Sequence, residues 1–356
     1  TMRRRMSSSS LPQMKMKTMK TTTMMQRWQY GGSRSKFCGA FGSPAAWNRQ
    51  IIASRRNHFT STAIASVSNT NINNQASSSP STSWDGTSMS QAQFMERDTV
   101  LVTDHNDIVT SSATKKDSHI FTPTNPRGIL HRAFSVFLFD ASTSELLLQK
   151  RASTKITFPN VWTNTCCSHP LHGMEPNEVD GVEDVKDGSV GGVRNAAVRK
   201  LGHELGMDVK ELERMSGEFK FLTRVHYWAA DTVTHGEKSQ WGEHEIDYIL
   251  FATIPNKHAL TTLNPHPEEV DDTRWVSQSQ LLQMFDDDTL LFSPWFRIIA
   301  NKWMVGGGGW WDDLEKTMNT NMFCDYETIH RFDPPEEHMG GGGGAGPWLC
   351  EPESSV

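Results

Sequence analysis

A pair of adjacent cysteines followed by a histidine is the first segment whose residue types could do chemistry. Cys166, Cys167 and His169 lie within the sequence TNTCCSHP. Side chains alternate along an extended chain, so we expect Cys167 and His169 on one face and Cys166 on the other. A histidine or a metal near Cys167 would favour its thiolate form. Without such a neighbour, the two cysteines would be small buried residues near a turn.

Two glutamates separated by one residue form the second such segment. Glu243 and Glu245, in the sequence WGEHEIDY, share one face of a predicted strand, and His244 points the other way. Two acids on one face repel each other unless a cation or a shared proton relieves them, although an exposed strand end would also tolerate them. Together with His169, and with His131 at the start of another apolar segment, they favour a mixed imidazole and carboxylate metal site. Such a site suits Zn, Mn or Fe better than a thiolate site would.

Strands dominate the segments that must position these residues. Apolar runs bounded by turn residues predict strands over residues 133–139, 146–148, 219–229, 246–254 and 275–276. Helical spacing predicts a helix over 193–205 that stops at Gly206, and Ser293 with Pro294 predicts the start of another helix. Strands and helices do not alternate strictly. The predicted fold class is therefore α/β or α+β, a single domain with a mixed β-sheet flanked by helices.

The charged residues are divided unevenly along the chain. Residues 1–84 contain twelve Lys or Arg and no Asp or Glu, whereas the remainder has a net charge of −18 and the whole chain −6. A basic, hydroxyl-rich and acid-free leader is typical of a mitochondrial or plastid transit peptide. The alternative is a disordered tail without targeting function on a cytoplasmic protein. Because residue 1 is Thr, we expect the chain to begin within a longer product.

Composition also sets the expected domain bounds. We expect residues 1–97 to be leader and linker, 98–333 to be the folded domain, and 334–356 to be a flexible tail rich in Pro and Gly. No stretch of about 20 apolar residues occurs, so no membrane span is predicted. The basic block lies outside the expected domain, and a nucleic-acid partner is therefore not expected.

These segments, in this order, resemble the type I isopentenyl-diphosphate Δ-isomerases, a Nudix-like family. The resemblance covers roughly residues 98–333 and is strongest over 130–139, 156–171 and 241–248. It implies a single Nudix-like domain that converts isopentenyl diphosphate into dimethylallyl diphosphate in isoprenoid biosynthesis. It also implies a small-molecule isoprenoid diphosphate as the binding partner. We expect a monomer, with an oligomer left open.

The resemblance assigns roles to particular side chains. It implies that the catalytic residues are Cys167, Glu245 and Tyr227. The implied metal ligands are His119, His131, His169, Glu243 and Glu245. The implied substrate-binding residues are Arg151, Lys155, Lys115, Lys200 and Trp295. A Mg²⁺ ion would be held by the substrate diphosphate and Glu204, and a second divalent metal (Zn, Mn or Mg) by the His/Glu site.

The chemistry of such an isomerase needs residues of these types. Moving a double bond in an unactivated alkene requires one proton to be added and another to be removed, through a tertiary carbocation. The acid and the base should therefore lie on opposite sides of a flat, dry pocket. Glu245 with Tyr227 can deliver one proton and Cys167 can take the other, with the roles exchanged in the reverse direction. The faces of Tyr227 and Trp295 can stabilise the cation.

Two other functions are compatible with parts of this pattern. A Nudix hydrolase would cleave a diphosphate, but its motif needs a glycine and three glutamates where this chain has Val185, Gly191, Lys200 and His203. A protein that only binds metal on the same fold is the other alternative. It would have no use for the complete Cys167, Glu245 and Tyr227 set.

Overall fold

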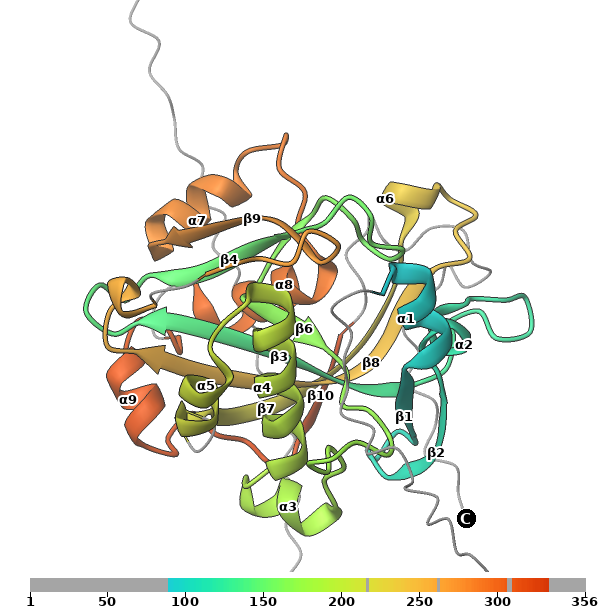
Figure 1. The fold of residues 1–356 in the computed structure, drawn as a ribbon, viewed down its shortest axis with the longest axis horizontal. Helices are drawn as coiled ribbons and strands as arrows, with labels where there is room; N and C mark the ends of the chain where they lie inside the picture. Colours follow the sequence, from blue (N-terminus) through green and yellow to red (C-terminus); the bar gives the residue numbers. More distant parts are fainter. Residues whose placement is uncertain (1–88, 216–217, 261–262, 306–308, 333–356) are drawn as a thin grey trace, which may run out of the picture. The chain divides into compact units, whose positions relative to one another are not determined.

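The computed structural model describes residues 89–215, 218–260, 263–305 and 309–332 (Figure 1). The expected leader up to residue 88 and the expected tail, residues 334–356, lie outside these ranges. Within them, no helix combines the length and the apolar character that crossing a membrane requires.

Ten strands of the described residues form one mixed sheet, with β3 (His131–Asp140) as a central strand (Figure 1). β8 (Gly242–Ile254) runs parallel to β3 along its whole length and occupies one edge of it. β7 (Lys220–Ala230) pairs with β8 in the antiparallel sense, and β10 (Ile329–Phe332) pairs with β7 in parallel. The predicted mixed sheet is therefore confirmed.

The other edge of β3 carries shorter strands. They are β1 (Thr99–Thr103), β2 (Val109–Thr114), β4 (Leu146–Arg151), β5 (Trp162–Thr163), β6 (Cys166–Ser168) and β9 (Val270–Val276). β1, β4 and β6 each pair antiparallel with a different part of β3. β2 extends the sheet beyond β1, while β5 and β9 both pair with β4. Consequently, a residue of β6 and a residue of β8 lie on opposite sides of β3.

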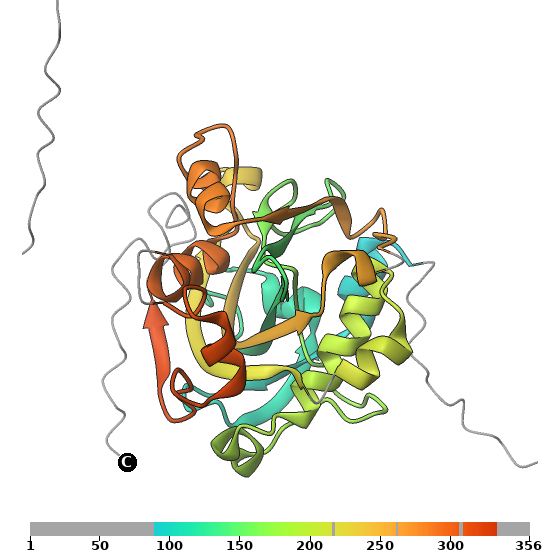
Figure 2. The same cartoon turned by 90° about the vertical axis from the view of Figure 1, so that its left-hand side faces the viewer.

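Helices cover both faces of the sheet (Figure 2). α4 (Gly191–Leu205) and α5 (Val209–Met215) pack on one face, and α7 (Gln278–Phe285), α8 (Pro294–Ile299) and α9 (Leu314–Asn319) pack on the other. The other described helical segments are short: α1 (Gln91–Arg97), α2 (Lys115–His119), α3 (Val182–Asp187), α6 (Thr232–His235), the 3-10 turn Lys257–Ala259 and the π-helical turn Ala300–Met304. The predicted single domain with flanking helices agrees with this arrangement.

Burial on both faces explains why β3 is apolar for most of its length. Phe134, Val136 and Leu138 belong to the core beneath α4, whereas Phe137 and Phe139 belong to the core beneath the C-terminal helices. All residues of β3 are buried. A strand covered on both sides shows a nearly continuous apolar run rather than an alternating one. Each large apolar side chain buried in this way stabilises the fold by about 1.5–3 kcal/mol.

Helix α4 ends where the sequence predicted. Gly206 has φ of 63°, in the left-handed region, and its N–H donates to the carbonyl oxygen of Gly202 at 3.1 Å. A Cβ at this position would lie 2.5 Å from the carbonyl oxygen of Asn264. Glycine is therefore required both by the backbone conformation and by the space available.

A short helix precedes residue 98, the expected start of the domain. Residues 91–97, assigned to the linker, form α1, in which the side chains of Phe94 and Met95 are only 3% and 5% exposed. The side-chain amide of Gln91 donates to the backbone oxygen of Glu268 at 2.7 Å. Two apolar residues in a seven-residue helix do not stand out from Ser-rich surroundings. The packed domain thus begins before residue 98.

Candidate active site and metal centre

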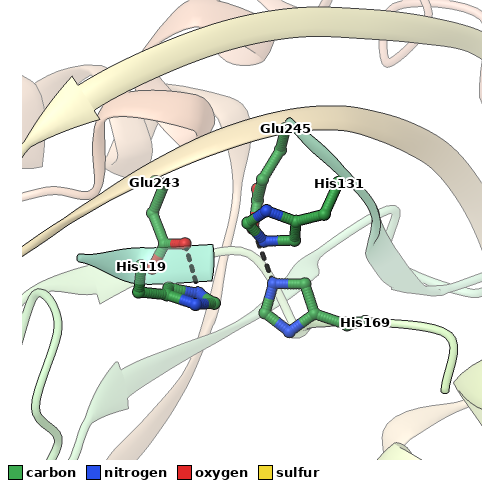
Figure 3. Close-up of side chains that lie close together, drawn as sticks. All are labelled: His119, His131, His169, Glu243 and Glu245. Carbon is green, nitrogen blue, oxygen red and sulfur yellow. Dashed lines mark hydrogen bonds and ion pairs between the residues drawn. The ribbon is translucent and has the colours of Figure 1, made fainter. Parts of the chain in front are cut away.

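Five side chains that could bind a metal converge at the start of the two long parallel strands (Figure 3). They come from the end of α2, the first residue of β3, the segment after β6 and the start of β8. This ligand cluster consists of His119, His131, His169, Glu243 and Glu245. All five are buried. The structure therefore brings together the five residues that the family resemblance had implied.

The candidate ligand atoms point at a common centre. One such atom from each residue lies within 4.8 Å of all the others. Nε2 of His119 is 2.7 Å from Oε2 of Glu243, and Nε2 of His169 is 2.8 Å from Oε1 of Glu245. Within the described ranges, Nε2 of His131 has no hydrogen-bond partner, since its distance to Oε1 of Glu245 is 3.7 Å. Because buried polar atoms without partners are costly, three imidazoles and two carboxylates in this arrangement fit a divalent metal.

The protonation states suit the same role. Burial and the charge of His119 lower the pKa of His131 to about 3. Burial, with the charge of His131, lowers the pKa of His169 well below its usual range. Burial alone would raise the pKa of Glu243, but His119 outweighs it and the pKa falls to about 2. Neutral imidazoles and an ionised carboxylate are the forms that bind metals.

The two residues expected to move protons lie on opposite sides of β3. β6 sets Cys167 level with Ser135 on one edge, and β8 sets Glu245 level with His131 on the other. Both Cys167 and Glu245 line one cavity. Cys166 is fully buried in the core beneath α4. The predicted division of the two cysteines between two faces is confirmed.

Both of these groups hold protons readily. Burial raises the pKa of the Cys167 thiol to about 12, although the guanidinium of Arg151, with Nη1 3.5 Å from Sγ, opposes the shift. Burial and the neighbouring charge of Glu243 raise the pKa of Glu245 well above its usual range. From the sequence, a histidine or a metal near Cys167 would favour its thiolate, whereas burial without one would not. In the structure, burial outweighs the opposing charge of Arg151, so the pKa of the thiol is raised rather than lowered.

Two aromatic side chains form another wall of the cavity. The hydroxyl of Tyr227, on β7, donates to Oε2 of Glu245 at 2.5 Å. The ring of Trp295, at the start of α8, lies 6.2 Å from the ring of Tyr227, measured between centroids. Nε1 of Trp295 donates to Oδ1 of Asn164 at 3.1 Å, which fixes the orientation of the indole. Both aromatic residues are buried, so their rings are held in place within the wall.

Three cationic side chains line the cavity as well. Arg151 lies over the ring of Trp295, with the guanidinium carbon 5.5 Å from the ring centroid. Lys155 and Lys115 also contribute to the wall. Burial, together with the charges of Lys155 and Lys200, lowers the pKa of Lys115 to about 8. A wall of this charge and depth can bind a compact polyanion.

Two residues expected at the site lie behind its wall. Neither Lys200 nor Glu204, both on α4, is among the described residues that line the cavity. Nζ of Lys200 is 3.1 Å from Oε1 of Glu204. The other carboxylate oxygen of Glu204 accepts a hydrogen bond from Nε2 of Gln149 at 3.0 Å. The structure therefore places these two residues beside each other but apart from the ligand cluster.

Sequence reasoning missed residues that support the site from behind. Glu269 forms an ion pair with Lys155, although 114 positions separate the two residues. Its local sequence reads as an acidic surface loop, and no local pattern reveals the partner. Ser135 also lines the cavity, and its hydroxyl donates to Oδ2 of Asp247 at 2.7 Å. The strand alternation that grouped Glu243 with Glu245 could have included Asp247, since it lies two residues further along.

The sequence is similar to a known domain family and to several named proteins. The chain matches the NUDIX domain model over residues 129–296. It is 46% identical over 240 residues to a Phaffia rhodozyma protein named isopentenyl-diphosphate delta-isomerase, covering 67% of this chain and 86% of that protein. A Bos taurus protein named isopentenyl-diphosphate Delta-isomerase 1 is 40% identical over 256 residues, which are 71% of this chain and 100% of that protein.

A plant relative carries the same name with a location. The Arabidopsis thaliana protein named isopentenyl-diphosphate Delta-isomerase I, chloroplastic, is 40% identical over 247 residues. The match covers 68% of this chain and 76% of that protein. Similar proteins thus occur in fungi, plants and mammals under one activity name.

Proposed function

The chain belongs to the isopentenyl-diphosphate delta-isomerase family, and we propose from its site how it interconverts isopentenyl and dimethylallyl diphosphate. The observation that carries the proposal is the placement of Cys167 and Glu245 on opposite edges of β3, within one cavity. Proton transfer at two separate carbons of one substrate requires two such groups.

Cys167 and the Glu245–Tyr227 pair act as the acid and the base. Because its pKa is raised, the thiol of Cys167 can act as the acid and give a proton to one end of the alkene. Glu245 then takes a proton from the other end, with the hydroxyl of Tyr227 holding its carboxylate in place. In the reverse direction Glu245 delivers and Cys167 accepts. Each residue thus alternates between the two roles.

The aromatic wall stabilises the intermediate. Protonation of the alkene leaves a tertiary carbocation, and the faces of Tyr227 and Trp295 offer electron density to it. Cation–π interactions are worth roughly 0.5–2 kcal/mol each, with the larger values in dry sites. Burial of both rings also keeps water from trapping the cation as an alcohol.

The cationic wall holds the diphosphate. Arg151, Lys155 and Lys115 line the cavity and supply charged donors for its oxygens. Binding energy from this remote group orients the alkene between the acid and the base. We further propose that Mg²⁺ accompanies the diphosphate and that Glu204 and Lys200 act from the layer behind the wall. The domain outside the leader is acidic overall, so these local charges must provide the anion site.

We propose that the ligand cluster holds a divalent metal, either Zn, Mn or Mg. A metal ion bound there supplies positive charge that favours the ionised forms of the two carboxylates. Nε2 atoms from three histidines and oxygens from Glu243 and Glu245 are the expected ligands. Because Glu245 belongs both to this cluster and to the acid–base pair, metal binding and catalysis are coupled through a single side chain.

Diphosphate hydrolysis fits the structure less well. At two positions where the hydrolase motif needs glutamates, the chain has Lys200, which is paired with Glu204, and His203. A hydrolase would need acidic metal ligands at these positions. Pure metal binding would leave the cationic wall and the Tyr227–Glu245 hydrogen bond without a use.

For the regions outside the structure, we propose that the basic leader directs the protein to a plastid or mitochondrion, with the cytoplasm as the alternative. The name of the Arabidopsis relative supports a plastid. We propose a catalytic domain that ends near residue 333, followed by a flexible tail, and a monomeric enzyme. Import of a leader fusion into isolated organelles, compared with a fusion lacking residues 1–84, tests the location.

Incubation of the protein with isopentenyl diphosphate and Mg²⁺ in deuterated water tests the function. Mass spectrometry of dimethylallyl diphosphate carrying deuterium would support proton transfer between solvent and substrate. Release of phosphate without any dimethylallyl product would support the hydrolase instead and contradict the proposal.

A further inference from the structure

A buried carboxylate behind the cationic wall is not used by the mechanism above. Glu269 lies just before β9 and its side chain is 3% exposed. Its Oε2 accepts from Nζ of Lys155, and its Oε1 lies 3.5 Å from Nζ of Lys200. Both lysine side chains are only 7% exposed. One acid therefore serves two ammonium groups that have little access to water.

These groups form an alternating row of charges. Lys155, at the cavity wall, contacts Glu269, and Glu269 contacts Lys200. Nζ of Lys200 lies 3.1 Å from Oε1 of Glu204. We call these four residues the charge chain. It connects the lysine expected to touch the diphosphate with the acid proposed to act beside Mg²⁺.

The backbone around Glu269 is fixed at both ends. Its N–H donates to the carbonyl oxygen of His266 at 2.9 Å, and its carbonyl oxygen accepts from the N–H of Ala152 at 3.0 Å. The N–H of Lys155 donates to the oxygen of Ala152 at 3.1 Å. The segment that carries Lys155 and the segment that carries Glu269 are thus tied together by main-chain hydrogen bonds.

The charge balance explains why an acid is needed at this point. A lysine ammonium group sits on a flexible four-carbon chain, so its position depends on its partner. Burial of an unpaired ammonium group is costly, and two neighbouring ones also repel each other. Burial alone would raise the pKa of Glu269, but Lys155 and Lys200 hold it well below its usual range, so the carboxylate stays ionised.

We propose that Glu269 is a positioning residue for the diphosphate: it holds Lys155 at the cavity wall and links it through Lys200 to Glu204. This inference rests on the proposed function, because it assumes that the cavity receives a diphosphate. Removal of a negative charge could in principle strengthen anion binding. The fixed backbone and the shared buried ammonium groups indicate instead that loss of position outweighs the gain in charge.

Three variants test the proposal. Glu269→Gln keeps the shape but removes the charge, and Glu269→Asp keeps the charge but shortens the reach. Glu268→Gln removes an equal charge one residue away and is the matched control. Steady-state turnover of isopentenyl diphosphate gives kcat and KM, and calorimetric titration with inorganic pyrophosphate and Mg²⁺ gives affinity without turnover.

We expect Glu269→Gln to raise KM and weaken pyrophosphate binding by about tenfold or more, with kcat reduced by less than about threefold. Glu269→Asp should raise KM by about threefold, and Glu268→Gln should match the wild type. Unchanged binding in both Glu269 variants, or tighter pyrophosphate binding in Glu269→Gln, would overturn the proposal. So would a fall in kcat at unchanged KM.

Two controls distinguish failure of this proposal from a folding defect and from failure of the proposed function. If Glu269→Gln fails to fold, as judged by its thermal transition, the threefold change expected for Glu269→Asp decides the question. A wild-type protein that binds pyrophosphate but forms no dimethylallyl product would refute the proposed function while leaving the positioning role measurable. The calorimetric comparison between variants would still decide it.

Discussion

The ligand cluster and the charge chain both bury several ionisable groups, but they satisfy them in different ways. In the charge chain, acids and ammonium groups alternate, so each charge has an opposite charge as its neighbour. In the ligand cluster, three imidazoles and two carboxylates face a common centre, and Nε2 of His131 has no hydrogen-bond partner among the described residues. The first region balances its charges within itself, whereas the second is arranged so that it could hold a metal ion.

Removal of divalent metal should have the largest effect, because it acts on the ligand cluster and not on the charge chain. Chelation should lower isomerase activity by roughly 100-fold or more, because a bound cation contributes several kcal/mol in such sites. Zn²⁺, Mn²⁺ or Mg²⁺ should restore activity and raise Tm by mass action. The measurement is turnover together with metal content after dialysis.

A pair of histidine variants sharpens the metal test. His169→Ala removes a ligand and should lose bound metal, whereas His172→Ala changes an exposed histidine three residues away and should retain it. Equal metal content in the two variants, or full activity in metal-free protein, would remove the basis for the ligand cluster as a metal site.

Titration of Lys115 should have the next largest effect, and it concerns the cationic wall alone. Its pKa of about 8 means that raising the pH above this value removes a positive charge from the free site. KM for isopentenyl diphosphate should therefore rise above pH 8, by up to about tenfold per pH unit. The profile of KM against pH checks this expectation.

Substitution by arginine gives the matching control. Lys115→Arg keeps its charge across the range and should flatten the rise in KM. Lys116→Arg alters the neighbouring exposed lysine, which pairs with Glu96, and should leave the rise in place. A rise that persists in Lys115→Arg would assign it to another group.

Removal of α1 should have the smallest effect on catalysis and a clear effect on stability. A chain beginning at residue 98 loses the buried side chains of Phe94 and Met95, worth about 3–6 kcal/mol together. Its Tm should fall by roughly 10 °C relative to a chain beginning at Met89. The ring of Phe94 also packs edge-on against His203, 5.3 Å between centroids, and Nδ1 of His203 lies 3.7 Å from Oε1 of Glu269, so KM should rise a few-fold. Thermal melts of the two chains test whether α1 belongs to the domain. Equal Tm values would show that it does not.

The contrast between predicted and missed residues has a physical origin. β3 and β8 could be predicted because burial on both faces leaves continuous apolar runs in the sequence. Four residues of the ligand cluster could be predicted because they lie within long motifs of the family, whereas His119 was assigned from loop spacing alone. Glu269 could not, since its role arises from contact between two loops 114 positions apart. Composition also gave no sign of α1, because this helix contributes only a few buried side chains.

Protonation was the least predictable property of the site. A histidine or a metal near Cys167 would favour its thiolate, but burial raises the pKa of that thiol to about 12. Desolvation depends on everything that surrounds a group, and alternation along one strand does not report it. The face toward which Cys167 points was predictable from the sequence, whereas the pKa of its thiol was not.

Variants of the two adjacent cysteines test most directly whether proton transfer occurs from both sides of β3. Cys167→Ala should reduce isomerisation by about 10³-fold or more, because general acid–base groups contribute on this scale, while its Tm stays close to the wild type. Cys166→Ala should lower Tm, since this side chain is fully buried in the core, but should retain most of the activity. Rates of dimethylallyl diphosphate formation for the two variants decide the matter. Normal turnover in Cys167→Ala would contradict the account.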